Sequence, residues 1–543
     1  MNRSTFKSGV SREQPSLLPP RIEDYVAPDN PVRAIDAFGD TVELDRMGFR
    51  RPGSAGGRGQ PAYDPRDLLK LFLYGYTNRI RSSRNLEREA IRNLELIWLL
   101  KGLQPGYRTI AKFRSENWAA LKALSRDFVV MMRELGLLGG ERVAIDGAFF
   151  DGNASKASIK TRKAITKRLA AIEADIEAYG AAVEANDEAS DLAEAAPPPS
   201  ERDGGGHGGD VGQRMAAMLE KRDKLKADLA QLDASGETQL SCTDPDARLL
   251  SKNGQVVAGY NVQIAVDAKE KLIVAHEVVN DGNDSGQLYP MAKAAKKELG
   301  VEALTALADT GYDNSHGLKD CEENGIVAYV PQAERSGQMK AQGRLSHDEF
   351  IYDVQADAYR CPAGKLLTPT KGRKVCPSGR SDIRYMSRKA DCGACVLRSR
   401  CLSAKTPTRT IQRWEHEAVL ERHRARMKDG GAVMRRRAEL AEHPFGTLKC
   451  RAGYRHFLVR GFDKVRGECS LMVLCYNLSR VLSIVGFDRL IAYLTQRAGK
   501  LLFLRLRDVL AGALGAATLL IERIWSQIRA ECIPTRLPGG CAI

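Results

Sequence analysis

The stretch Glu141-Arg-Val-Ala-Ile-Asp146-Gly-Ala-Phe-Phe-Asp151-Gly152 carries one carboxylate in the middle of a β-branched and aromatic run. This run predicts a well-buried strand with Val143, Ile145 and Phe149 on its apolar positions. An ionised carboxylate in such a core is costly unless it is paired or binds a cation. Asp146 is therefore a candidate metal ligand at the edge of a sheet. The alternative is an acid that ends a strand and opens a turn with Gly147.

Length and composition indicate a soluble protein with a basic balance. At 543 residues the chain is too long for one ordinary core, so two or three domains are expected. Its 83 Lys and Arg against 68 Asp and Glu give a net charge of +15, which favours a polyanionic partner. Neither a signal sequence nor a membrane span is apparent, and the 12 cysteines are scattered. We expect a cytoplasmic protein without a membrane partner.

Residues 1–140 predict a helical, basic domain. From Asp64 onward, apolar residues recur at the three- and four-residue spacing of a helix. Arginines lie between and beside them, and Arg79, Arg81 and Arg84 are candidate DNA contacts. Such a module is either a helix-turn-helix reader of DNA or a structural dimerising cap, and no turn fingerprint decides between the two.

Residues 141–484 have the pattern of an α/β domain. Beyond the Asp146 strand, the apolar runs predict strands at 253–267, 272–279, 303–308 and 326–331, and helices at 285–299 and 315–324. The resulting order is strand, strand, strand, helix, strand, helix, strand, which is that of a ribonuclease-H-like mixed sheet. The apolar segment 462–484 is expected to pack on this sheet.

Two insertions and a tail complete the predicted organisation. Residues 155–240 predict a polar helical hairpin whose Pro- and Gly-rich tip is expected to be disordered. Residues 335–410 are expected to form polar loops with a group of cysteines. Residues 485–543 predict a helical C-terminal tail with basic interruptions.

Three acids fall on elements that a single core could bring together. Asp309 ends a predicted strand, and Glu442 lies on a late helix. Carboxylates are hard ligands for Mg²⁺ or Mn²⁺, ions that activate a water or a 3′-hydroxyl and stabilise the leaving oxygen in phosphoryl transfer. No Gly-x-x-x-x-Gly-Lys-Ser/Thr element is present, which argues against a nucleotide triphosphatase. This convergence favours the metal-ligand interpretation of Asp146.

The chain resembles the bacterial insertion-sequence transposases that carry an Asp-Asp-Glu (DDE) triad on a ribonuclease-H-like fold. The resemblance extends from Asp24 to about Ser483. Its motifs are Ala144-Ile-Asp-Gly-Ala-Phe-Phe150, Thr243-Asp-Pro-Asp-Ala-Arg248, Gly259-Tyr-Asn-Val-Gln263, Ala308-Asp-Thr-Gly-Tyr312 and Glu442-His-Pro-Phe-Gly-Thr-Leu-Lys449. It implies that Asp146, Asp309 and Glu442 form the metal-binding catalytic triad. It also implies that Lys449 contacts DNA near the cleaved phosphate, and that the protein acts as a homo-oligomer on double-stranded DNA.

The region around Glu442 departs from related groups in one respect. Those groups place a Tyr and an Arg seven and four residues before the Glu, where this chain has Arg435 and Ala438, with Arg437 one step out. Seven residues separate Glu442 from Lys449, which is close to two helical turns and predicts one shared helix face.

Three acids near these motifs are not assigned to the site. Asp244 and Asp246 are expected to form a turn with Arg248. Asp151 lies an odd number of residues from Asp146, so in a regular strand its side chain faces the other way.

A cysteine group lies within residues 335–410. Cys392-Gly-Ala-Cys395, with Cys361 before it and Cys401 after it, fits a structural tetrahedral zinc site in a ribbon-like insertion. Cys376 could replace one of the four. Because the flanking spacings are irregular, reduced structural thiols and an iron–sulfur cluster are the alternatives.

Together these features predict a DNA transposase associated with the nucleoid. It would bind the ends of its element, hydrolyse a phosphodiester bond with Mg²⁺ or Mn²⁺, and join the freed 3′-hydroxyl to target DNA. The basic balance would supply sequence-independent affinity, and residues 60–138 are expected to recognise the ends. Two other functions stay open, a catalytically silent DNA-binding protein and a nuclease without strand transfer.

Overall fold

The computed structural model describes residues 21–50, 61–194, 208–252, 254–332, 341–376, 379–503, 522, 523 and 526. The chain divides into two compact units, one of Met1–Ala120 with Leu478–Ile543 and one of Leu121–Asn477. Disorder was expected over 184–212, but 184–194 and 208–212 are helical, and 195–207 and most of the predicted C-terminal tail lie outside the described residues.

The N-terminal part of the first unit is helical, as the sequence predicts. Its main helices are α1 (Pro31–Asp40), α3 (Pro65–Thr77), α4 (Ser83–Arg92), α5 (Leu94–Leu99) and α6 (Tyr107–Glu116). The side chains of Asn30, Asp64 and Asn93 accept N-terminal backbone N–H groups of α1, α3 and α5. The Lys70 ammonium is buried and lies 2.5 Å from Asp36 and 2.7 Å from Asp40, so it is paired where it leaves water.

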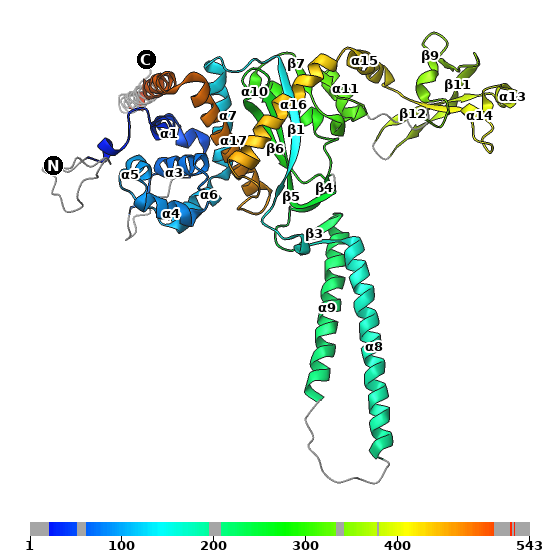
Figure 1. The fold of residues 1–543 in the computed structure, drawn as a ribbon, viewed down its shortest axis with the longest axis horizontal. Coiled ribbons are helices and arrows are strands. Elements are labelled where there is room, and N and C mark those ends of the chain that lie inside the picture. The colour runs from blue at the N-terminus through cyan, green and yellow to red at the C-terminus, as the bar shows by residue number, and fades with distance from the viewer. Residues whose placement is uncertain are drawn as a thin grey trace, which may run out of the picture. The chain divides into compact units, whose positions relative to one another are not determined.

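The second unit is built on a mixed six-stranded sheet (Figure 1). Its strands are β1 (Arg142–Asp151), β4 (Arg248–Lys252), β5 (Gln255–Asp267), β6 (Ile273–Val279), β7 (Leu304–Leu307) and β8 (Ile326–Tyr329). The order is β4-β5-β1-β7-β8, and β6 also pairs with β5. The pairs of β1 with β5 and of β5 with β6 are antiparallel, whereas β1 with β7 and β7 with β8 are parallel.

Helices connect and cover these strands. The helix α10 (Leu288–Leu299) lies between β6 and β7 in the chain, and α11 (Ser315–Glu323) lies between β7 and β8, so the predicted order of elements is found. The helix α16 (Gly431–Gly446) packs on β1, where Leu440 and Ala441 form a buried cluster with Ala144. The apolar contact between α16 and β1 is therefore at Ala144, two residues before Asp146.

The helix α17 (Phe462–Val485) packs on β6, as expected for the apolar segment 462–484. Asn477 accepts the backbone N–H of Ile273 at 3.0 Å and donates to its carbonyl at 2.8 Å. Among the described residues, this helix alone is long and apolar enough to cross a membrane, which the sequence analysis had not expected. However, 67% of its most apolar window is buried inside the protein. Such burial is typical of a helix that belongs to a protein core.

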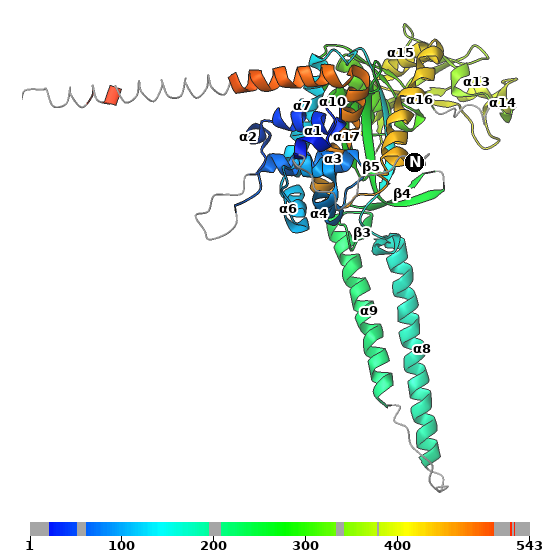
Figure 2. The ribbon, with the colours of Figure 1, turned by 60° about the vertical axis from the view of Figure 1, so that its left-hand side comes forward.

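A long helical hairpin interrupts the sheet between β1 and β4. The helices α8 (Arg162–Glu194) and α9 (Gly208–Ser235) run side by side in Figures 1 and 2. At its base, β2 (Ile159–Thr161) pairs antiparallel with β3 (Gln239–Ser241).

The cysteine-rich insertion is a second sheet, so the expectation of polar loops over residues 335–410 is wrong. Its antiparallel strands are β9 (Ile351–Asp353), β10 (Ala358–Arg360), β11 (Leu366–Val375), β12 (Ser381–Ser387) and β13 (Thr410–Trp414). Its hydrophobic core cluster has six buried residues, and β11 is mostly exposed. Because so few residues are buried, the apolar alternation that reveals a strand is weak here.

Candidate active site

Asp146 lies in the middle of β1, on the face of the sheet that α16 covers. Side chains alternate along a strand, so Asp146 shares a face with Ala144, which contacts α16. The side chain is 14% exposed, and its Oδ1 accepts the Gly147 N–H at 2.9 Å. Burial raises the pKa of the Asp146 carboxyl, and the neighbouring Arg437 guanidinium opposes that rise. The carboxylate is therefore desolvated and favours a cationic partner.

Asp309 follows β7 and lies beside Asp146. In the parallel pairing of β1 and β7, Ala144 is opposite Leu307, and both acids lie two residues farther along. Asp309 caps the 3₁₀ turn Thr310–Tyr312, where its Oδ1 accepts the Gly311 N–H at 2.9 Å. The strand register therefore brings together two acids that are far apart in sequence.

Arg437 of α16 connects the two carboxylates. Its guanidinium nitrogens lie 3.8 Å from Oδ2 of Asp146 and 3.9 Å from Oδ2 of Asp309. In the sequence, Arg437 stands out only as displaced from the position of the family's arginine. Arg437 lies one helical turn before Ala441, which packs on β1. This spacing is the signal that could have identified Arg437 as a residue facing β1.

Glu442 lies on the same helix but does not complete a cluster. It follows Ala441 directly, and its side chain is exposed. Among the described residues, no three His, Cys, Asp or Glu side chains form a group that could hold a metal ion as placed. The structure thus brings Asp146 and Asp309 around one cationic group and leaves Glu442 at the surface of the adjoining helix.

Lys449 contacts β1 close to Asp146. Its ammonium donates to the Phe149 carbonyl at 2.7 Å and lies 4.6 Å from the centre of the Phe150 ring. Burial lowers its pKa, while the acids Asp151 and Asp146 raise it. Lys449 lies in a π-helical turn, Thr447–Arg451. The prediction that Lys449 and Glu442 share a helix face assumed α-helical spacing, and that assumption does not hold in this turn.

A buried polar network connects the turn after Asp309 to β5, and it was not predicted from the sequence. Asp284 is 5% exposed and accepts Asn261 Nδ2 at 2.8 Å and Gln263 Nε2 at 2.7 Å. The Tyr312 hydroxyl donates to Gln263 Oε1, which ties the turn after Asp309 to β5. The sequence held a signal, because Asn261 and Gln263 are polar residues in a buried strand, as Asp146 is.

Gly147 provides the space for this network. Gln263 lies opposite Gly147 in the pairing of β1 with β5. A Cβ at Gly147 would overlap the Gln263 amide and lie 2.6 Å from Asp284 Oδ1. The glycine that the sequence analysis considered as a turn residue is therefore required in mid-strand for close packing.

Asp244 and Asp246 form a turn, as predicted. Arg248 donates to the Pro245 carbonyl at 2.6 Å within that turn. Asp244 accepts the Tyr260 hydroxyl at 2.7 Å and the Gly461 N–H at 2.9 Å. These bonds connect β5 to the segment that begins α17, which is a structural role.

The predicted DNA-contacting arginines of the first unit lie in different environments. Arg79 is exposed, and Arg84 is exposed with its guanidinium 5.4 Å from the centre of the Tyr107 ring. Arg81 is only 9% exposed. Its side chain is therefore poorly placed to reach a phosphate.

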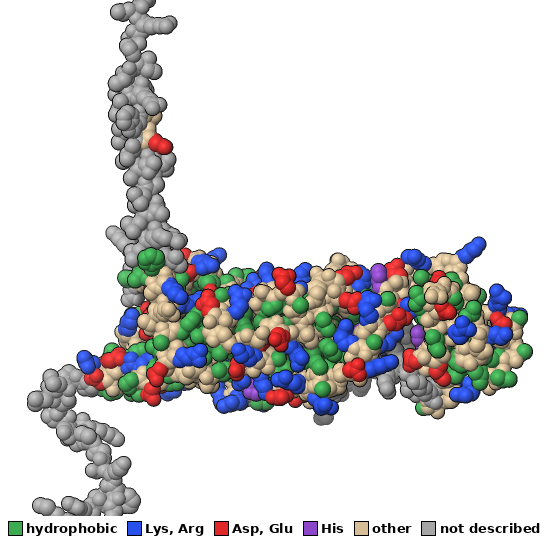
Figure 3. Space-filling model, turned by 90° about the horizontal axis from the view of Figure 1, so that it is seen from above, with side chains coloured by type: hydrophobic (Ala, Val, Ile, Leu, Met, Phe, Trp, Pro, Cys, Tyr) green, Lys and Arg blue, Asp and Glu red, His purple; other side chains and the backbone are tan. Residues whose placement is uncertain are grey.

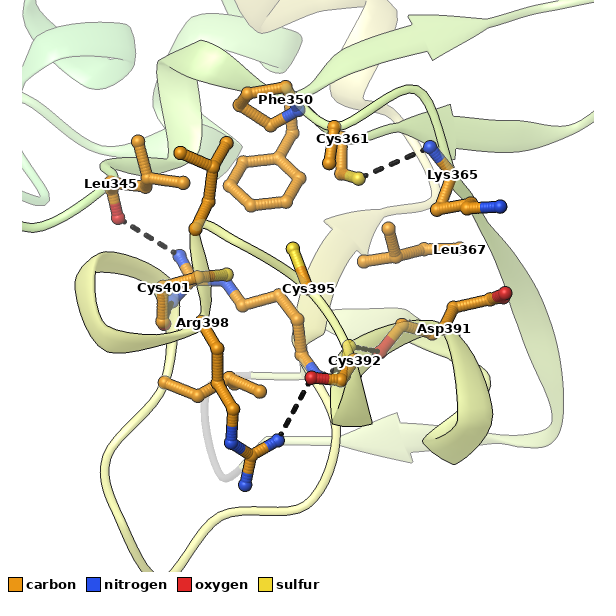
Figure 4. A pocket seen from close by; sticks show the side chains of 16 residues that line it. Leu345, Phe350, Cys361, Lys365, Leu367, Asp391, Cys392, Cys395, Arg398 and Cys401 are labelled. Carbon is orange, nitrogen blue, oxygen red and sulfur yellow. Dashed lines mark hydrogen bonds between the residues drawn. The ribbon is translucent and has the colours of Figure 1, made fainter.

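The four cysteines predicted as zinc ligands line a single pocket, whereas Cys376 is absent from its lining. Cys361 follows β10, Cys392 belongs to α13 (Lys389–Gly393), Cys395 follows that helix, and Cys401 ends α14 (Arg398–Cys401) (Figure 4).

Comparison with protein-family models finds two transposase domains in the chain. Residues 360–482 match the "Transposase DDE domain" model, and residues 20–116 match the "Transposase domain (DUF772)" model. None of the curated proteins compared with the chain matches it. Both matched models describe transposase domains, and together they support an insertion-sequence transposase of the DDE type.

Among solved structures, similarity is found to a cryo-EM structure of the piggyBac transposase synaptic complex with hairpin DNA. The alignment covers 94% of this chain and 87% of that chain, with 9% identity and a TM-score of 0.30. A similarity of this size carries no argument about the site.

Proposed function

We propose that the protein binds the DNA ends of its own element, cleaves a phosphodiester bond there and transfers the freed 3′-hydroxyl to target DNA. The observation that carries the proposal is the meeting of Asp146 and Asp309 on neighbouring parallel strands, with Arg437 against both carboxylates. The strand order β6-β5-β1-β7-β8 and its mixture of directions support a ribonuclease-H-like core.

The chemistry of the two aspartates fits a divalent cation. Burial raises the pKa of Asp146. The Arg437 guanidinium lies beside this carboxylate, so the position next to Asp146 favours a positive charge. On this proposal Asp146, Asp309 and Glu442 hold Mg²⁺ or Mn²⁺, which would supply an activated nucleophile and stabilise the leaving oxygen. Glu442 would have to turn from the exposed side of α16 toward β1 to take part.

The remaining residues of the site position the carboxylates and the DNA. Tyr312, Gln263 and Asp284 fix the turn that presents Asp309. Lys449 places a positive charge beside β1, where a phosphate next to Asp146 would pass. The exposed Arg79 and Arg84 of the helical unit offer contacts to the backbone of double-stranded DNA. A homo-oligomer on paired ends, associated with the nucleoid, follows from the resemblance to insertion-sequence transposases.

The test compares Asp146→Asn with Asp151→Asn on DNA that spans the ends flanking the native gene. Asp151 lies on the same strand but is exposed at its end, so its substitution is the matched control. We expect the wild type and Asp151→Asn to cut and join ends with Mg²⁺. Asp146→Asn should cleave at least about 100-fold more slowly than the wild type, because the substitution removes an anionic ligand.

Gel-shift binding should be similar in all three proteins, because phosphate contacts by basic residues are untouched. Cleavage that survives in Asp146→Asn would contradict the site assignment. Cutting without joined products would instead indicate a nuclease, and binding without cutting by the wild type would indicate a silent DNA-binding protein.

A further inference from the structure

Four thiols converge on a pocket at one end of the inserted sheet. Figure 4 shows Cys361, Cys392, Cys395 and Cys401 around this space, among apolar side chains such as Phe350 and Leu367. These cysteines come from the turn after β10 and from the segment of α13 and α14, which are separated in the chain by β11 and β12. A group bound by all four would therefore tie two separate segments together.

The backbone around Cys361 has the form of a sulfur-binding turn. The Cys361 carbonyl accepts the Gly364 N–H at 2.8 Å, and the Cys361 N–H donates to the Lys365 carbonyl at 2.9 Å. The Lys365 N–H then points at Cys361 Sγ, 3.3 Å away. Gly364 has a φ of +77°, which favours glycine. An N–H group directed at sulfur favours a thiolate and orients it.

The other sulfurs also interact with their surroundings. Cys392 Sγ lies 3.0 Å from the Ser387 hydroxyl. All four cysteines line the same pocket, so their side chains lie around one space.

Two arginines among the lining residues donate hydrogen bonds to the backbone of the cysteines. Arg398 donates to the Cys392 carbonyl at 3.1 Å, and Arg409 donates to the Cys401 carbonyl at 3.2 Å. Both side chains line the pocket. A divalent ion with four thiolates carries a net charge of −2, which two guanidinium groups can balance.

Cys376 lies in a turn like that of Cys361, but it does not line the pocket with the other cysteines. Its carbonyl accepts the Gly379 N–H at 2.9 Å, and its N–H donates to the Arg380 carbonyl at 2.8 Å, as in the turn at Cys361. It lies at the opposite end of β11, where its sulfur is 3.9 Å from Asp382 Oδ2. Because β11 separates Cys376 from the pocket that the four cysteines line, Cys376 does not replace any of them.

We propose that Cys361, Cys392, Cys395 and Cys401 bind one zinc ion in a tetrahedral four-thiolate site that fixes this end of the inserted sheet. Four thiol protons pass to solvent as Zn²⁺ binds. As placed, no three of the thiols form a metal-ready group, so the side chains turn inward on binding. A sheet whose hydrophobic core cluster has six buried residues gains from such a cross-link, as small domains with little core do.

The experiment measures zinc in the purified full-length protein and in two matched variants. Elemental analysis should find about one zinc per chain in the wild type. Cys376→Ser should retain this zinc, whereas Cys395→Ser should lose most of it. Replacement of zinc by Co²⁺ should give the absorption of a tetrahedral thiolate complex in the wild type and in Cys376→Ser.

A second measurement protects the test against misfolding of Cys395→Ser. In the wild type, a chelator should expose four additional thiols to a thiol reagent, and added Zn²⁺ should protect them again. Wild-type protein that binds no zinc, loss of zinc in Cys376→Ser, or disulfides in place of the extra thiols would overturn the proposal. None of these readouts depends on DNA cleavage, so the zinc site and the proposed transposase activity can fail separately.

Discussion

The core sheet and the inserted sheet belong to one compact unit but are held together differently. In the core, β1 pairs with β5 over nine residue pairs, and Val143, Ile145, Tyr260 and Ile264 are completely buried. In the inserted sheet the hydrophobic core cluster has six buried residues, and most of β11 is exposed. The core is therefore stabilised by burial, whereas the inserted sheet depends on turns, tyrosine hydrogen bonds and the proposed zinc ion.

Charge separates the two regions as clearly as packing does. The core carries its acids in buried, bonded positions, such as Asp284 and Asp267. In residues 341–414, Lys and Arg outnumber Asp and Glu by more than two to one. Figure 3 shows Lys and Arg side chains interspersed with acidic and hydrophobic ones over the visible face. The inserted sheet thus carries an excess of positive charge on a lightly packed framework.

The largest effect is expected from a methyl group added to a glycine of each sheet. In Gly259→Ala the new Cβ would overlap the Phe150 carbonyl oxygen and lie 2.5 Å from the Gly152 nitrogen. Both are backbone atoms of the paired strand and cannot yield. We expect a loss of about 3 kcal/mol or more in the free energy of unfolding, measured by urea denaturation.

Gly372→Ala in β11 is the matched change in the inserted sheet. Gly372 has a φ of +103°, and a Cβ there would meet nothing within 4 Å. Only backbone strain remains, so we expect a loss of about 1–2 kcal/mol. Equal losses in the two variants would show that the two sheets do not differ in packing as we describe.

The difference in packing between the two sheets also explains which of their strands could be predicted from the sequence. The core strands were predictable because apolar runs such as that around Ile264 are long and bounded by turns. That Asp146 and Asp309 lie close together was predictable, because one acid interrupts an apolar run and the other follows one. The role of Arg437 was not, since it depends on how α16 rotates onto β1. The inserted sheet was not predicted either, because its register rests on hydrogen-bonded turns and exposed strands with little apolar alternation.

A smaller effect should follow removal of one tyrosine hydroxyl from each sheet. Tyr312→Phe leaves Gln263 Oε1 without its donor beside the turn that presents Asp309. We expect about 1–3 kcal/mol of destabilisation, and a 10- to 100-fold loss of cleavage, roughly as for residues that orient metal ligands. The assay is Mg²⁺-dependent cutting of element-end DNA at a temperature where the variant is folded.

Tyr385→Phe supplies the control from the inserted sheet. The Tyr385 hydroxyl donates to Asp357 Oδ1 at 2.5 Å, so its loss also breaks a bond to a partner. We expect a similar loss of stability and a cleavage rate within about threefold of the wild type, because Asp357 does not support Asp309. Equal losses of cleavage in the two variants would indicate a general effect on folding and would contradict a positioning role for Tyr312.

The smallest effect concerns pH and the junction at which the chain returns from the inserted sheet to the core. His423 of α15 (Glu417–Lys428) is 1% exposed, and its Nε2 accepts the Val330 N–H at 3.4 Å beyond the end of β8. Burial, with help from Arg426 and Arg424, lowers the pKa of His423 to about 4, from an ordinary value of 6.5. The folded state therefore holds His423 neutral over a range in which the unfolded chain is protonated.

The sign of the pH effect follows from this difference. As pH falls from 6.5 toward 4, the unfolded state binds a proton that the folded state does not, so the free energy of unfolding decreases. We expect His423→Gln, which keeps an acceptor but cannot titrate, to remove about 1–2 kcal/mol of this decrease. His276, whose pKa burial also lowers to about 4, keeps part of the slope in both proteins. Urea unfolding followed by tryptophan fluorescence across this range measures the difference, and parallel curves for the two proteins would show that His423 is not buried in its neutral form at this junction.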